Sequence, residues 1–166
     1  MEEFVGEVWH KLITGKARSD FSAARVELAG LQSQLATYFR ALGGEPGKSV
    51  EGADARRFNT RRKLTQRVAG THRRFPVCWQ DDRSLKLPLN LACFEDAGLN
   101  EALYFWLTAL AAQQPQVRHW LTDNQQATLS LLQQRPGLVA GYHRLVAATL
   151  ALRPILDSLK GPERER

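Results

Sequence analysis

The chain has 166 residues, with 23 Lys or Arg and 17 Asp or Glu side chains, a formal net charge of +6 at pH 7. This length suits a single domain with a sizeable core. No run of eighteen apolar residues occurs, so the sequence predicts no membrane span, and Glu2 and Glu3 do not suit the start of a signal peptide. We therefore expect a cytoplasmic protein whose two cysteines, Cys78 and Cys93, stay reduced.

The first third of the chain predicts two helices. Residues 2–14 carry apolar side chains three and four positions apart, which gives one apolar stripe. The stripe is Phe4, Val5, Val8, Trp9, Leu12 and Ile13. A second helix is predicted over about 22–42, capped at its start by Asp20 or Ser22. We expect Gly43 and Gly44 to end it with a left-handed C-cap.

The middle of the chain predicts a small antiparallel sheet of two or three strands. Residues 48–53 suggest a short edge strand, and 59–69 a modest helix. The following apolar residues then alternate with other side chains: Phe75, Val77, Trp79, Leu85 and Leu87. A period of two on both sides of a polar turn at 81–82 predicts a β-hairpin, with the first three residues on its apolar face.

The last third returns to helix. Asn100 is expected to cap a central helix, which should stop at Pro115, and a further helix should end before Pro136. A final helix is predicted over about 138–159, kinked by Pro154. The predicted fold class is therefore mainly α (α+β), a bundle of about five helices with a small antiparallel β-annex near residues 48–88.

The familiar chemical motifs fail on spacing. The stretch 43–49 is similar to a phosphate-binding loop but has the wrong glycine spacing and follows a helix instead of preceding one. Two short acidic stretches, at 20–24 and 82–86, each lack the second hydroxyl ligand of a metal loop. Cys78 could be considered as a catalytic thiol, but its alternating context favours packing or simple exposure. We expect no catalytic, metal or cofactor-binding residue in this chain, and no enzyme activity.

One window concentrates the positive charge. Between residues 55 and 80 there are eight basic and no acidic side chains, which leaves a net charge of −2 for the rest of the chain. The eight are Arg56, Arg57, Arg61, Arg62, Lys63, Arg67, Arg73 and Arg74. A solvated surface and a docking surface for an acidic protein are both open interpretations. Nucleic acid is less favoured, because few aromatic side chains interleave with the basic ones.

Five segments together resemble a known protein family. They are FVGEVWHKLIT (4–14), YFRALGGEPG (38–47), LTQRVAG (64–70), LKLP (85–88) and LNEALYFWL (99–107). In this order they are similar to the amino-terminal region of the adaptors that work with MoxR-type AAA+ ATPases. The family includes the CbbO-type subunit of a Rubisco activase and the NorD-type nitric oxide reductase activation protein. The opening segment favours the CbbO-type branch.

The resemblance implies a partner and a domain organisation. It implies a non-catalytic adaptor that couples a hexameric ATPase of CbbQ type to Rubisco and so releases inhibitory sugar phosphates, with the NorD role as the alternative. The family carries a von Willebrand factor A domain at its carboxyl end, with a metal site that no residue here matches. We therefore expect one amino-terminal adaptor domain over 1–160 and a disordered tail over 161–166. Neither nucleic acid nor a membrane is an expected partner.

Overall fold

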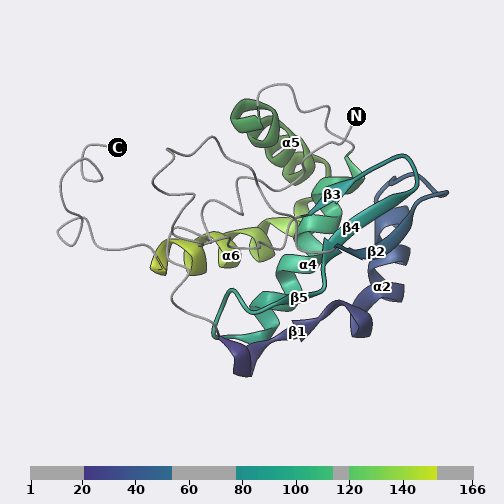
Figure 1. The fold of residues 1–166 in the computed structure, drawn as a ribbon. Coiled ribbons are helices and arrows are strands. Elements are labelled where there is room, and N and C mark those ends of the chain that lie inside the picture. Colours follow the sequence, from purple (N-terminus) through teal and green to yellow (C-terminus); the bar gives the residue numbers. More distant parts are fainter. Residues whose placement is uncertain (1–20, 54–77, 114–119, 153–166) are drawn as a thin grey trace, which may run out of the picture.

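The computed structural model describes residues 21–53, 78–113 and 120–152, without the side chains of residues 120 and 121. These residues contain four α-helices and two small sheets (Figure 1). The helices are α2 (Leu28–Ala41), α4 (Ala97–Ala112), α5 (Trp120–Gln134) and α6 (Val139–Ala151). The strands are β1 (Val26–Glu27), β2 (Ser49–Ala53), β3 (Trp79–Gln80), β4 (Ser84–Pro88) and β5 (Asn90–Leu91). The predicted class, mainly α with a small sheet annex, is confirmed.

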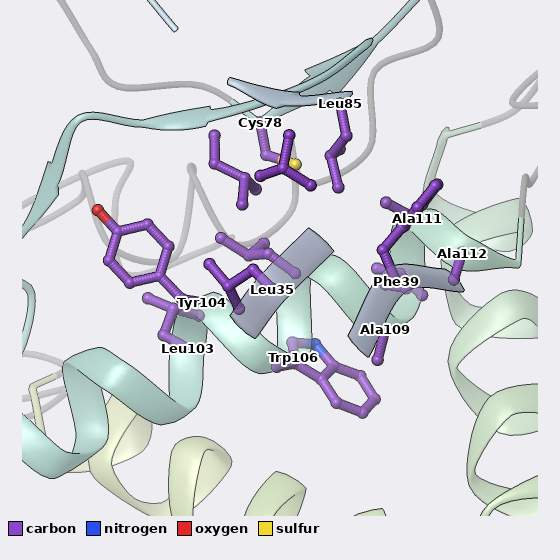
Figure 2. Close-up of a cluster of buried hydrophobic side chains, with 14 of the residues drawn as sticks. Leu35, Phe39, Cys78, Leu85, Leu103, Tyr104, Trp106, Ala109, Ala111 and Ala112 are labelled. Carbon is purple, nitrogen blue, oxygen red and sulfur yellow. The ribbon is translucent and has the colours of Figure 1, made fainter. Parts of the chain in front are cut away.

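Helix α4 lies at the centre of the described residues, as predicted. It contacts α2, β1 and β5, and the later helices α5 and α6 (Figure 1). Aromatic pairs fix two of these contacts. Tyr38 of α2 meets Phe105 edge-on at a centroid distance of 5.1 Å, and Trp106 lies 4.6 Å from the ring of Tyr142 in α6. Figure 2 shows Trp106 on the side of α4 away from Cys78 and Leu85 of the sheet region.

The start of α2 differs from the prediction. Ser22–Ala24 form a 3-10 turn, and the α-helix begins only at Leu28. The delay arises because Val26 and Glu27 pair with Leu91 and Asn90 as a second, two-stranded sheet. The Leu28 amide then donates to the Leu89 carbonyl at 2.9 Å, which satisfies a helix-end donor without a side-chain cap.

The end of α2 confirms the predicted glycine cap. Gly43 has φ of +96°, the left-handed region that favours glycine. Its amide donates to Arg40 O at 3.1 Å and the amide of Gly44 donates to Phe39 O at 2.9 Å, the two bonds of a Schellman motif. A glycine is also needed at position 44, but for a steric reason: a Cβ there would lie 2.5 Å from the Phe39 ring.

The three-stranded sheet has the order β2-β4-β3, with β2 at an edge as predicted. β3 and β4 form the predicted antiparallel hairpin, whereas β2 runs parallel to β4, so the expectation of an all-antiparallel sheet is wrong. A parallel pair needs a long crossover, and the chain supplies one between residues 53 and 79.

The predicted faces of the first hairpin strand are also reversed. Gln80 pairs with Leu85, which pairs with Val50, and these three are buried. Trp79 instead lies on the outer face in register with Lys86 and Glu51, and is only partly buried. Positions 75 and 77 lie outside the described residues.

The central helix begins earlier than predicted, because Asn100 is not its cap. Asp96 is the N-cap, and its side chain accepts from the Gly98 amide at 2.7 Å. Asn100 lies inside the first turns of α4 and is fully buried. Its side-chain oxygen accepts from the amides of Cys93 and Phe94 at 2.8 and 3.0 Å. Its side-chain nitrogen donates to the carbonyls of Ala24 and Phe94 at 2.9 and 2.8 Å.

The boundary between the last two helices lies where Pro136 predicts it. α5 ends at Gln134, a 3-10 turn spans Pro136–Leu138, and α6 then runs from Val139. The described part of α6 stops at Ala151, so the predicted kink at Pro154 lies outside the described residues, as do the helices expected over 2–14 and 59–69. In the part of the chain that the structure describes, no helix has the length and apolarity needed to cross a bilayer.

We predict that Gly43→Ala lowers the free energy of unfolding by about 1–2 kcal/mol, because a Cβ is strained at a left-handed φ. Gly47→Ala is the matched control: no atom lies within 4 Å of an added Cβ and its φ is not left-handed. We expect its effect to stay within about 0.5 kcal/mol. Urea denaturation measures both, and equal effects would contradict the cap assignment.

We predict that Asn100→Ala lowers the free energy of unfolding by at least about 3 kcal/mol, since it leaves several buried backbone groups without a hydrogen bond. Asn90→Ala removes the same amide from an exposed strand position and should cost less than about 0.5 kcal/mol. Denaturant titration of the two variants provides the comparison. A loss below 1 kcal/mol for Asn100→Ala would show that the four bonds matter little.

Candidate partner surface

The predicted contact residues belong to one continuous stretch between two strands of the sheet. All eight basic side chains of the window at 55–80 lie in the stretch 54–77, outside the described residues. What the structure does place is the pair of strands on either side. The stretch begins after the last residue of β2, Ala53, and ends before Cys78 and β3. Whether the window binds a partner therefore stays a prediction.

The two thiols are in environments that suppress reactivity. Cys78 is buried, and burial raises the pKa of its thiol from 9.0 to about 12. Burial also raises the pKa of the Cys93 thiol, to about 11. Both cysteines are free of disulfide bonds. Because the thiolate is the nucleophile, the structure favours packing over catalysis at Cys78.

Two carboxyl groups with a lowered pKa have structural roles. The pKa of Glu51 is lowered first by a hydrogen bond from Lys86, its cross-strand neighbour. The pKa of Asp81 is lowered first by the Arg83 amide, and its side-chain oxygen also accepts from the Ser84 amide at 2.8 Å. The hydrogen bonds to Asp81 stabilise the polar turn between β3 and β4. Ser84, part of the rejected acidic loop, therefore belongs to this turn.

Two buried hydroxyl groups of α4 are committed to internal bonds, whereas the buried indole nitrogen of Trp106 has no hydrogen-bond partner among the described residues. Tyr104 donates to the Pro88 carbonyl at 2.8 Å, and Thr108 donates to the Tyr104 carbonyl at 2.8 Å. Burial raises the pKa of the Tyr104 hydroxyl far above its usual range. Among the described residues, no group of three or more His, Cys, Asp or Glu side chains is placed to hold a metal ion.

The surface of the described helices is poor in charge. Each of the four helices carries one Lys, Arg, Asp or Glu side chain: Arg40, Glu101, Asp123 and Arg144. Charged residues other than Arg are depleted in the centre of protein–protein interfaces. A helix surface of this kind is therefore better suited to contact another protein than to remain fully solvated.

The outer sides of α5 and α6 show this composition most clearly. On α5 the exposed residues include Gln125, Gln126, Gln133 and Leu129, and Leu129 keeps 49% of its surface exposed. On α6, Leu150 keeps 52% exposed. Sequence reasoning missed this surface, although the signal was present: only five residues between Ala97 and Ala151 carry a formal charge.

Comparison with known proteins identifies the relatives of this chain. It is 49% identical over 154 residues to Protein NorD of Stutzerimonas stutzeri, covering 93% of the chain and 25% of that protein. An uncharacterised Pseudomonas aeruginosa protein is 47% identical over 99% of the chain and 27% of its own length. Protein NorD of Brucella abortus is 34% identical over 93% of the chain and 26% of that protein. The similarity is to NorD-type proteins.

These relatives bear on the choice between the branches of the family that the sequence resembles. They support the NorD-type branch and give no support to the CbbO-type branch that the opening segment favoured. The chain spans about a quarter of the length of the curated relatives it matches. No family model matches the chain, and no solved structure matches it.

We predict slow alkylation of the buried thiol in the folded protein at pH 8. Raising the Cys78 pKa from 9.0 to about 12 lowers the thiolate fraction about a thousandfold below that of the unfolded chain. The raised pKa also means that this group's contribution to stability is present below pH 9 and is lost as the pH rises toward 12. Iodoacetamide labelling followed by mass spectrometry, with and without urea, measures the rates; equal rates would contradict the burial.

Proposed function

We propose that this chain is a non-catalytic accessory domain of a NorD-type protein, which couples a hexameric MoxR-type AAA+ ATPase to its client. The observation that carries the proposal is the coverage of the similarity. The match to the NorD proteins of Stutzerimonas and Brucella takes in 93% of this chain and about a quarter of each relative. One part of a longer adaptor accounts for that pattern better than a self-contained enzyme.

The client that we propose is nitric oxide reductase. The family resemblance offers two clients, and the named relatives favour the NorD role over Rubisco activation. In this proposal the chain uses no cofactor of its own, works in the cytoplasm and contributes docking, while the ATPase supplies the force. The whole assembly would need the further domains that the longer relatives imply.

Two features of the described residues support a docking role. The buried side chains of Asn100 and Tyr104 in α4 are occupied by hydrogen bonds that hold the fold. The outer helices offer a surface with few charges, which suits contact with protein. We propose that the basic window adds an electrostatic contact, since a segment with eight basic and no acidic residues favours an acidic surface on the ring.

A nucleic-acid-binding module is the competing interpretation of the same window. Binding to phosphates would fall steeply with salt, with a slope set by the number of phosphates neutralised. A titration with DNA and RNA at low salt separates the two. Absence of binding removes this alternative, whereas tight and salt-sensitive binding would favour it over the adaptor role.

We predict that reversing Arg61, Arg62 and Arg67 to Glu weakens capture of the ATPase ring by tenfold or more, on the order of 1.4 kcal/mol. The measurement is co-purification and ATPase stimulation with the NorD-type protein that carries this chain. Reversal of three exposed arginines elsewhere is the matched control: Arg25, Arg40 and Arg83. Unchanged capture by the first variant, or equal loss in both, would remove the window from the proposal.

A further inference from the structure

Strand β2 forms an edge of the three-stranded sheet. In the order β2-β4-β3, no strand of the described residues pairs with the side of β2 that faces away from β4. The Ser49 amide donates to the Arg83 carbonyl at 3.0 Å, so Ser49 and, two residues on, Glu51 direct their backbone groups toward β4. Val50 and Gly52 therefore direct their backbone groups away from it. An edge of this kind is a template for pairing with another strand.

Helix α2 places a polar side chain on this edge. The side-chain nitrogen of Gln32 donates to the Val50 carbonyl at 2.7 Å, which is the bond that an added strand would make to the same oxygen. The bond is only partly buried, so water can serve this carbonyl when the side chain is absent, and the fold depends little on it. One acceptor of the edge is therefore already occupied by a side chain of the same molecule.

The edge is self-complementary for a second copy of the chain in antiparallel orientation. With a two-fold axis at Glu51, Val50 of one copy would face Gly52 of the other, and each such pair would exchange two backbone hydrogen bonds. This pairing requires the Val50 carbonyl to which Gln32 is bonded. It also places the two Glu51 carboxylates directly opposite each other, and like charges in that position are destabilising. A second copy is thus the partner that both side chains oppose.

Glu51 is held in its charged form beside the edge. Lys86 and Ser49 each donate a hydrogen bond to its carboxylate, and these bonds lower its pKa, so the group is ionised at neutral pH. Lys86 comes from β4, on the side away from the edge. Charged side chains on edge strands are one way in which proteins prevent two sheets from joining.

We propose that Gln32 and Glu51 together prevent β2 from pairing edge to edge with β2 of a second copy. Gln32 occupies the acceptor that the second strand needs, and Glu51 adds repulsion at the two-fold axis. The contact that carries the proposal is the Gln32 bond to Val50, which lies entirely within the described residues. The proposal does not depend on the ATPase or on the client.

Sedimentation velocity of the whole chain over a range of concentrations tests the proposal. We expect Gln32→Ala combined with Glu51→Gln to dimerise with a Kd at least about tenfold lower than that of the wild-type chain. Gln32→Ala alone, which leaves the ion pair with Lys86 intact, should shift the Kd in the same direction by less. The matched control is Gln34→Ala combined with Glu101→Gln, because it makes the same two changes at exposed positions of α2 and α4.

Hydrogen–deuterium exchange locates the contact. In the double variant, amides in 49–53 should become about tenfold more protected as the protein concentration increases. Retained protection of 97–112 shows that a variant is folded, and if the double variant loses it, Gln32→Ala alone decides the test.

The outcomes separate edge pairing from other forms of association. Stronger dimerisation of the Gln32 variants, with new protection over 49–53 and no change in the matched control, supports the proposal. An unchanged Kd overturns it, as does an equal change in the matched control. Dimerisation without protection over 49–53 assigns the contact to another surface and also overturns it. Failure here leaves ring capture untouched, so the two proposals are tested separately.

Discussion

The fold of the described residues depends on the side-chain amide of Asn100. One primary amide makes four hydrogen bonds, and they join three separate pieces of chain: the first turns of α4, the loop at Cys93 and Phe94, and the turn that ends at Ala24. A buried amide is costly unless its donors and acceptors are all used, and here they are. Ala24 and Cys93 are each two residues from the paired Val26 and Leu91, so these bonds lie next to the short sheet that precedes α2.

Sequence patterns predicted the helices correctly where glycine or proline marks a boundary or where the apolar periodicity is strong. Gly43 needs a left-handed φ, and Pro136 follows the end of α5, so both boundaries could be foreseen. The failed predictions have a common cause. They concern strands that pair through tertiary contacts but are too short to show a period in the sequence. Two-residue strands such as Val26–Glu27 give no periodic signal, and they moved the start of α2. Trp79 was assigned to the wrong face, because which face of a short strand is buried is set by its cross-strand neighbours, here Lys86 for Trp79 and Leu85 for Gln80.

The resemblance to a family of adaptors could be read from the sequence, whereas a contact surface could not. Short structural segments carried the likeness to the adaptors, but they contained nothing that separates one client from another, and the relatives shifted the choice to NorD. Local charge density drew attention to the window at 55–80 and away from the helices. The scarcity of charge on α5 and α6 becomes meaningful only when the structure shows that Leu129 and Leu150 face outward.

The sheet order affects the loop-closure entropy of the basic window, because the segment between β2 and β3 has both of its ends held by the same sheet. β4 lies between β2 and β3, and Trp79 is in register with Glu51, two residues before the end of β2. Strand spacings then place the two ends of the segment about 12 Å apart. Much of the loop-closure entropy of this segment is therefore lost when the sheet forms, before any partner arrives. A contact made through such a closed loop orders fewer degrees of freedom than the same residues would on a free tail.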